Sequence, residues 1–256
     1  MCDGWSGTTK SSLINFLVYC DRQAFYHKSV DASSHIHNHQ YILQLMEQMV
    51  AEIGEEYIVQ VVTDNDSNYK KAGEELMKSH PHIFWTPCAA HCVDLTLKEI
   101  GQLHQVKHVV EAAQNITRYI YNHTIVLRWM RDYCGGEILW PAITRFATNY
   151  IALDSLLKHR DGLKQMFRSE QWLSSHFATS RDGQEVETLV NNSNVLSRVS
   201  KIVQMIEPLY EVLRLVDGDR TPTMGLVYAK LEAAKKRIIA TLPKYSHMFI
   251  DIVEDR

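Results

Sequence analysis

The segment YIVQVVTDNDSNY, Tyr57–Tyr69, constrains the fold of the first hundred residues more than any other. In it an apolar, β-branched run, Tyr57–Thr63, ends abruptly in two carboxylates, Asp64 and Asp66. Such a run predicts a strand buried on both faces, which is typical of an interior strand in a helix-covered sheet. The acidic residues that follow either cap the start of a helix or serve as metal ligands at the end of the strand.

Strand and helix patterns alternate on both sides of this segment. Three strand signals precede it, at residues 1–9, Ser12–Cys20 and Ala24–Ala32, and the short connection between the last two predicts an antiparallel hairpin. An amphipathic helix comes next, with the apolar stripe Ile42, Leu45, Met46, Met49, Val50 and Ile53. A second helix, a short strand over Ile83–Pro87 and a third helix complete the order β-β-β-α-β-α-β-α.

From residue 102 onward the strand signals fade and helical periodicity dominates. Residues 102–121, 122–133 and 143–159 are predicted to be helices, and a longer helix follows them. We therefore predict two domains. Residues 1–101 form an α/β domain with an RNase H-like mixed sheet and flanking helices, and residues 102–256 form an all-helical region.

Composition excludes several classes of protein. The formal net charge of −3 gives no basic surplus of the kind that neutralises phosphates, although a local basic face remains open. No run approaches the roughly 20 apolar residues of a membrane span, and the N-terminus lacks the apolar core of a signal peptide. We interpret the five cysteines as reduced thiols of an intracellular protein.

The order of the strands suggests that the carboxylates bind a metal ion. In an RNase H-like sheet the first and fourth strands lie side by side, so Asp3 and Asp64 would face each other and repel unless a cation neutralised them. Mg²⁺ and Mn²⁺ take such oxygen ligands, and two such ions can clamp the oxygens of a phosphoryl transfer. The capping alternative stays open, with Asp66 and Ser67 better placed than Asp64 to start the helix.

The stretch CAAHC presents a second candidate metal site. Cys88, His91 and Cys92 lie at i, i+3 and i+4, so one helix face offers three ligands of the kind that zinc prefers. A structural zinc site needs a fourth ligand. We therefore expect no zinc, and interpret these residues as one half-buried face of a helix.

Four motifs occur in order before about residue 101: CDGWSGTTKSSLINFLVYC, KSVDAS, IVQVVTDNDSNYKKAGEELM and FWTPCAAHCVDLTLKEIG. Together they resemble the transposase-like domain of unknown function that is common in plant hAT-superfamily transposons. Two later stretches, YNHTIVLRWMRDY and ITRFATNYIALDSLL, are similar to the start of the helical region that interrupts the catalytic domain in that superfamily.

The resemblance implies an RNase H-like fold with an Asp-Asp-Glu site that uses Mg²⁺ or Mn²⁺ for DNA strand cleavage and transfer. The first two acids fall on Asp3 and Asp64, and a Cys/Asp-x-x-His motif falls on Cys88 and His91. The arginine of an Arg-Trp pair falls on Arg145, where phenylalanine replaces the tryptophan. The resemblance also implies DNA as a partner and a nuclear location.

The third acid of this pattern has no match. In the superfamily it lies after the helical insertion, and we expect this sequence to end inside that insertion. The glutamates of the helical half match no motif for the role; they are Glu185, Glu207, Glu211, Glu232 and Glu254. We therefore predict a truncated, transposon-derived chain that is inactive alone and binds Mg²⁺ or Mn²⁺ weakly at Asp3 and Asp64.

Two alternatives stay open. One is a metal-dependent nuclease that recruits a glutamate from the helical half. The other is a non-catalytic module that binds protein or DNA, or dimerises, through the helical half. An apolar patch or a basic stripe over residues 195–242 would indicate the second alternative.

Overall fold

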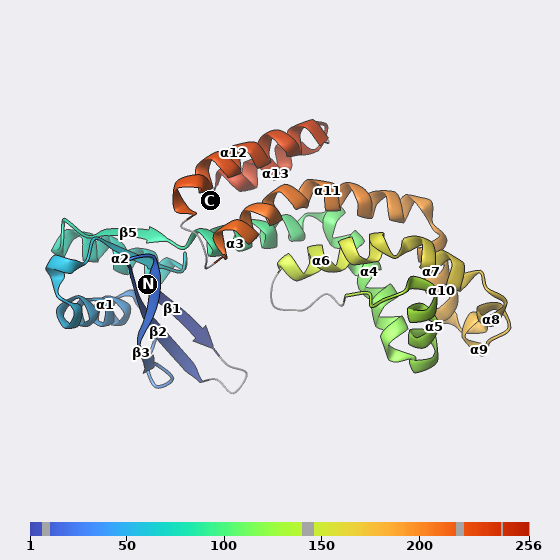
Figure 1. Ribbon diagram of the computed structural model, residues 1–256, viewed down its shortest axis with the longest axis horizontal. Coiled ribbons are helices and arrows are strands. Elements are labelled where there is room, and N and C mark those ends of the chain that lie inside the picture. The colour runs from blue at the N-terminus through green and yellow to red at the C-terminus, as the bar shows by residue number, and fades with distance from the viewer. Residues whose placement is uncertain (7–10, 140–145, 219–222, 242, 256) are drawn as a thin grey trace. The chain divides into compact units, whose positions relative to one another are not determined.

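The chain forms two compact units in a computed structural model that describes residues 1–6, 11–139, 146–218, 223–241 and 243–255. The first, here called the sheet unit, comprises Met1–Cys92 and Val216–Gly225. The second, the helical unit, comprises Val93–Leu215 and Leu226–Arg256 (Figure 1). The predicted domain boundary at residue 101 stays a prediction.

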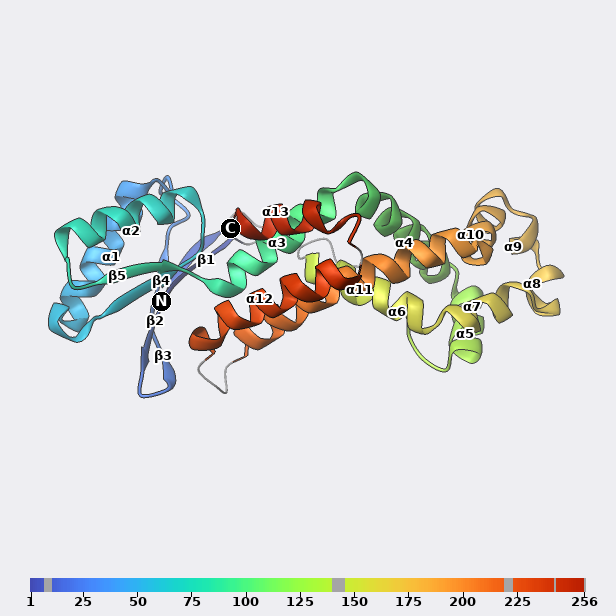
Figure 2. The ribbon, with the colours of Figure 1, turned by 90° about the horizontal axis from the view of Figure 1, so that it is seen from above.

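The sheet unit is built on a mixed five-stranded sheet of order β3-β2-β1-β4-β5 (Figures 1 and 2). The strands are β1 (Cys2–Ser6), β2 (Ser12–Cys20), β3 (Gln23–Asp31), β4 (Gln60–Thr63) and β5 (Phe84–Pro87). Strand β1 runs antiparallel to β2 and parallel to β4, and β4 runs parallel to β5. The predicted RNase H-like arrangement is thus confirmed, with β1 and β4 as neighbours at the centre.

The hairpin between β2 and β3 turns over Asp21 and Arg22, between the paired residues Cys20 and Gln23. Both turn residues have positive φ, 49° for Asp21 and 64° for Arg22. Two-residue hairpins favour this backbone because its twist matches that of the strands, and Asn-Gly or Asp-Gly is the usual sequence for it. Arginine at the second position is therefore strained by its Cβ.

Substituting Arg22→Gly is expected to stabilise the sheet unit by about 0.5–1 kcal/mol. Glycine removes the left-handed strain of roughly 1–2 kcal/mol, and part of that gain is offset by the larger freedom of the unfolded chain. Urea unfolding measures the change. Arg22→Ala keeps the Cβ and serves as the control, so an equal gain in that variant would show that the turn backbone is not the cause.

Helices α1 (His39–Ile53) and α2 (Ser67–Ser79) pack on one face of the sheet. Asn38 caps α1 by accepting a hydrogen bond from the Tyr41 amide, and Gly54, at φ 100°, ends it. The core beneath the helices contains Cys2, Ile14 and Phe16 from the strands, and from the helices it contains Ile42, Leu45, Met46, Met49, Val50, Tyr69, Ala72 and Leu76. The predicted apolar stripe of α1 is confirmed, apart from Ile53, which is half-buried.

The other face of the sheet carries exposed aromatic side chains. Residues alternate between the two faces of a strand, so the face opposite Cys2 and Phe16 bears Trp5 and, across the sheet, Phe84. These side chains are 52% and 66% exposed. The prediction that Tyr57–Thr63 forms a strand buried on both faces is therefore wrong.

The physical reason lies in what covers this strand and where it begins. A 3₁₀ turn, η1 (Glu55–Tyr57), occupies the start of the run, and Val59 is 73% exposed before β4 begins at Gln60. Helix α2 covers only the face that carries Thr63, whose side chain is buried. A strand in the interior of a sheet can thus have one face covered by a helix and the other face exposed.

His80, at the C-terminal end of α2, joins three elements of the sheet unit. Its Nε2 lies 2.7 Å from Glu47 Oε2 of α1, and its Nδ1 lies 2.8 Å from Glu55 Oε1 of η1. Hydrogen bonding to Glu55, and then to Glu47, raises the pKa of His80 above its usual value near 6.5. The bond to His80 lowers the pKa of Glu55 below 4.5.

The contribution of His80 to stability should peak between about pH 4.5 and 6.5. Because its folded pKa is raised, the His80 contribution is complete below the unfolded value near 6.5 and is lost as pH rises through the folded value. The Glu55 contribution, whose folded pKa is lowered, is complete above 4.5 and is lost as pH falls. Urea unfolding of the wild type and His80→Gln at pH 5.5 and 8.0 measures the difference.

His82→Gln is the matched control for this pH dependence. Its ring is 47% exposed, lies 3.7 Å from the Glu55 carboxylate and contacts the Glu55 carbonyl oxygen at 3.1 Å, so its removal should cost less than that of His80 and differ little between the two pH values. A loss in His80→Gln that is equal at pH 5.5 and 8.0 would contradict the assigned role of the ion pairs.

The rest of the described chain is helical, as predicted. Helix α3 (Ala89–Gln102) begins in the sheet unit. The helical unit continues with α4 (His104–Asn122), α5 (Thr124–Cys134), α6 (Phe146–Lys158), α7 (Arg160–Phe167), α8 (Glu170–Leu173), α9 (His176–Thr179), α10 (Arg181–Asn191), α11 (Ser193–Val216), α12 (Met224–Thr241) and α13 (Ser246–Glu254). Within the described ranges, no helix is long and apolar enough to cross a membrane.

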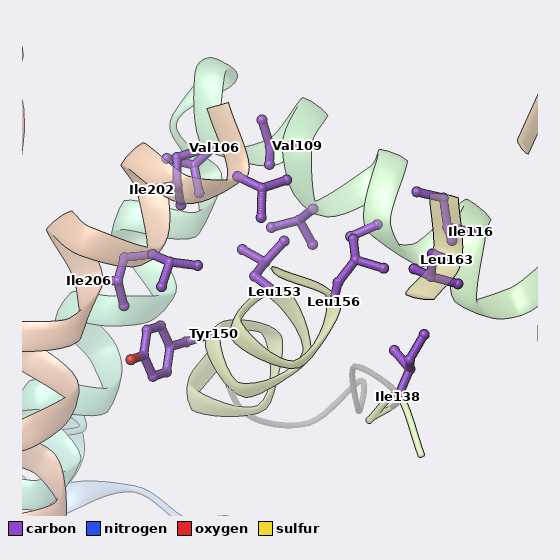
Figure 3. Packing of buried hydrophobic residues seen from close by; sticks show 14 of the residues in the cluster. Val106, Val109, Ile116, Ile138, Tyr150, Leu153, Leu156, Leu163, Ile202 and Ile206 are labelled. Atoms are coloured by element: carbon purple, nitrogen blue, oxygen red, sulfur yellow. The ribbon is translucent and has the colours of Figure 1, made fainter. Parts of the chain in front are cut away.

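The helical unit has a core of its own. Leu153 and Leu156 of α6 lie among side chains of α4 and α11, with Ile202 and Ile206 on the α11 side (Figure 3). Trp172, fully buried, packs its ring edge-on against Phe167 with centroids 4.5 Å apart. The helical unit therefore buries a large hydrophobic core of its own, to which Trp172 and Phe167 contribute aromatic rings.

Candidate functional site

The register of β1 and β4 brings Asp3 and Asp64 to neighbouring positions. Cys2 pairs with Thr63 in the parallel ladder, so Asp3 and Asp64 are the next residues along two adjacent chains. Neighbouring strands lie roughly 4.8 Å apart, and residues at matching positions point to the same face. Asp3 therefore belongs to the sheet face opposite the one that α2 covers, and Asp64 is the first residue after β4, next to it.

A buried thiol and phenol lie under this pair, on the α2 side of the sheet. Burial raises the pKa of the Cys2 thiol to about 12. Burial also raises the pKa of Tyr69, with smaller contributions from Cys2 and from the negative charge of Asp64. A Cβ on Gly4 would lie 2.7 Å from the Tyr69 hydroxyl, so glycine after Asp3 lets the ring fit against β1.

His91 lies beside Asp64 because the start of α3 is tied to the end of β4. The Cys88 amide donates a hydrogen bond of 2.7 Å to the Thr63 carbonyl oxygen. His91 follows in the first turn of α3, where its Nδ1 lies 3.5 Å from Asp64 Oδ1. The structure thus brings Asp3, near the start of β1, and His91, in the first turn of α3, to the C-terminal end of β4, where Asp64 follows.

Cys88 and Cys92 are half-buried at the start of α3. The predicted half-buried position of Cys88, His91 and Cys92 is confirmed, and the fully buried residues of the helix are Val93, Thr96, Leu97, Ile100 and Gly101. Val93, rather than either of the two cysteines, packs into the core. Across the described residues, no group of three or more His, Cys, Asp or Glu side chains is arranged to hold a metal ion.

Asp66 starts α2, and this part of the prediction is confirmed. Its carboxylate accepts a hydrogen bond of 2.9 Å from the Asn68 amide, and its backbone is extended as an N-cap requires. Ser67 is the first residue of the helix. The two carboxylates of the DND stretch therefore have different places, with Asp66 at the helix start and Asp64 at the strand end.

The chemistry of the pair fits a hard divalent cation only in part. Asp3 and Asp64 supply carboxylate oxygens, the ligands that Mg²⁺ and Mn²⁺ prefer. Asp3 is exposed and the Asp64 side chain is 22% exposed, so both can be reached from solvent. Two acids can hold such an ion weakly, with water completing its shell, but they do not make the three-acid site of a two-metal reaction.

Four of the five glutamates considered for the third acid form ion pairs within the helical unit. Glu207 and Glu211 of α11 both contact Arg237 of α12. Glu232 and Glu254 both contact Lys235, at 2.5 and 3.4 Å. The fifth, Glu185, is exposed on α10. Recruiting any of the first four to a metal would require breaking one of these pairs.

Arg145 lies outside the described residues, and Phe146 is the first residue of α6. The prediction for the Arg145 motif position therefore stays a prediction.

The motif analysis missed a pair of histidines at the start of α4. His104 and His108 stand four residues apart, in HQVKH, and their Nε2 atoms lie 3.0 Å from each other. The i, i+4 spacing on a helix was the signal that could have revealed them. They belong to the helical unit and do not take part in the Asp3 and Asp64 arrangement.

No curated protein matches the chain. A family model does match its N-terminal part, which carries the whole sheet, α1, α2, α3 and the first residues of α4. Residues 1–116 are similar to the family described as a domain of unknown function (DUF659).

Proposed function

We propose that the chain derives from an hAT-like transposase and that it is catalytically inactive alone. The observation that carries the proposal is the Cys2–Thr63 register, which makes Asp3 and Asp64 neighbours in an RNase H-like sheet. The match of residues 1–116 to DUF659 supports a transposase-like origin. In such a protein these two acids would be ligands of Mg²⁺ or Mn²⁺, which activates the attacking oxygen when bound.

The residues around the pair would serve binding rather than chemistry. His91 lies beside Asp64 on the α3 side, and the buried Tyr69 and Cys2, whose pKa values are raised by burial, stay uncharged on the α2 side. This arrangement positions two oxygen donors at the solvent side of the sheet. A third acid is needed to clamp both ions of a strand transfer, and the glutamates of α11, α12 and α13 are held by Lys235 and Arg237.

A plasmid-nicking assay tests the proposed inactivity. The purified chain should leave supercoiled DNA intact at millimolar concentrations of Mg²⁺ or Mn²⁺, which would occupy even a weak carboxylate site. Nicking by the wild type that disappears in both Asp3→Asn and Asp64→Asn would overturn the proposal in favour of a nuclease. Nicking that persists in both variants would indicate a contaminant.

A second candidate function is a protein-interaction module, and the surface of α12 favours it. Its first turns expose Met224, Leu226 and Tyr228, the last of them 78% exposed. Farther along the helix, Lys235 and Arg237 are paired with glutamates, so these charges do not form a basic stripe for DNA. The apolar turns suit a protein surface or a second copy of the chain better than a phosphate backbone.

Size-exclusion chromatography with light scattering tests this candidate as self-association. The wild type should shift towards a dimer as its concentration rises, and Leu226→Ser with Tyr228→Ser should remain monomeric. A wild type that stays monomeric at all concentrations would argue against a dimer formed through α12. Nuclear location and DNA binding remain proposals that rest on the likeness to transposases.

A further inference from the structure

We propose that His104 and His108 form a two-nitrogen binding site for a late divalent transition metal, of the class of Ni²⁺ and Cu²⁺. The site is independent of the acidic pair in the sheet unit and of the proposed transposase origin. Both imidazoles are exposed on the first turns of α4, a helix of 19 residues. Water and a metal ion therefore have free access to them.

The geometry of the pair is that of two cis ligands. The Nε2 atoms lie 3.0 Å apart, and the rings meet edge to face with centroids 4.3 Å apart and an interplanar angle of 87°. Metal–imidazole bonds are 2.0–2.1 Å long, so one ion bound to both nitrogens would subtend an angle of about 94° at the metal. Small rotations of the exposed rings suffice to aim both lone pairs at that point.

Two imidazole ligands favour one class of metal. Among divalent first-row ions the affinity of a nitrogen site rises through Ni²⁺ to Cu²⁺, and both ions place adjacent ligands at right angles in square-planar or octahedral shells. Mg²⁺ and Mn²⁺ prefer oxygen ligands, so they would not compete at this pair.

Glu111 provides a partner for the other nitrogen of His108. Its Oε2 lies 3.5 Å from His108 Nδ1, one helical turn farther along α4. A carboxylate beside Nδ1 favours the proton on that nitrogen and leaves the lone pair on Nε2, which faces His104. In the metal-free protein His104 can then donate its Nε2 proton to His108, and metal binding through both Nε2 atoms would require His104 to take the tautomer that carries its proton on Nδ1.

Calorimetric titration with Ni²⁺ at pH 7.5 tests the site, because Ni²⁺ does not oxidise the free thiols of this chain as Cu²⁺ does. The wild type should bind one equivalent that both His104→Gln and His108→Gln weaken at least tenfold, since each removes one arm of the chelate. Glu111→Gln should weaken binding less, by up to about tenfold. Lowering the pH to 5.5 should also weaken it, because protons compete for imidazole.

His247→Gln is the matched control, a single exposed histidine of α13 in the same unit. It should leave the affinity unchanged. The proposal is overturned if His104→Gln and His108→Gln bind Ni²⁺ as the wild type does, or if His247→Gln weakens binding as much as they do.

Discussion

Trp172→Ala is expected to lower the free energy of unfolding of the helical unit by about 3–5 kcal/mol. Trp172 is fully buried, and its ring packs edge-on against Phe167 and Tyr119. Its indole Nε1 donates a hydrogen bond of 2.9 Å to Glu187, which would lose a partner. The loss is a large part of the 5–15 kcal/mol by which typical domains are stable.

Leu173→Ala provides a matched control on the same short helix. Leu173 is 60% exposed, so its truncation should cost no more than about 0.5 kcal/mol. Urea unfolding followed by circular dichroism, which reports mainly on the helices, measures both variants. Similar losses in the two variants would contradict the buried position of Trp172.

Gly73→Ala is expected to destabilise the sheet unit by about 1–3 kcal/mol, although alanine favours helices more than glycine does. A Cβ at position 73 of α2 would overlap the indole ring of Trp85 on β5. That ring has little freedom to move, because its Nε1 donates a hydrogen bond of 3.0 Å to Thr63 Oγ1 of β4. Overpacking of this kind outweighs the roughly 1 kcal/mol gained in helix propensity.

Gly225→Ala tests whether the cost at position 73 comes from the contact. Gly225 lies near the start of α12, where a Cβ would meet no atom within 4 Å. Alanine there should be neutral or stabilise by up to about 1 kcal/mol. Equal destabilisation in both variants would indicate that close packing of α2 on β5 is not the reason.

Most of the fold could be predicted from periodicity. The strands Ser12–Cys20 and Phe84–Pro87 agree with the sequence patterns to within a residue, because β-branched runs bounded by turn residues leave few alternatives. The sequence did not predict which faces of the strands are covered by helices. The apolar run at Tyr57–Thr63 indicated two-sided burial, whereas its first residues form a 3₁₀ turn.

The helices between residues 160 and 191 were not assigned from the sequence. They include two of only four residues, α8 and α9, which are too short to show an amphipathic repeat. Helix α13 was not predicted for a related reason, because its nine residues span only about two and a half turns. Longer helices, such as α4 and α11, carry several turns of apolar spacing and were predicted.

Topology predicts one part of the candidate site, the pair of carboxylates. It does not predict the side-chain contacts around that pair. Strand order alone makes Asp3 and Asp64 neighbours, and the chain bears this out through the Cys2–Thr63 pair. The approach of His91 to Asp64 depends on how α3 leaves β5, which no spacing rule specifies. The Nε2 contact between His104 and His108 depends on side-chain rotamers in the same way.

The most direct test of the proposed metal site is thermal melting of the chain during a Mn²⁺ titration. If Asp3 and Asp64 bind Mn²⁺ in the folded protein, Mn²⁺ should raise the melting temperature of the wild type by mass action. The shift should persist in Asp66→Ala, which loses only its helix cap at a cost of about 1 kcal/mol. It should vanish in Asp64→Ala and Asp3→Asn. No shift in the wild type, or an equal shift in Asp64→Ala, would contradict a metal site at these carboxylates.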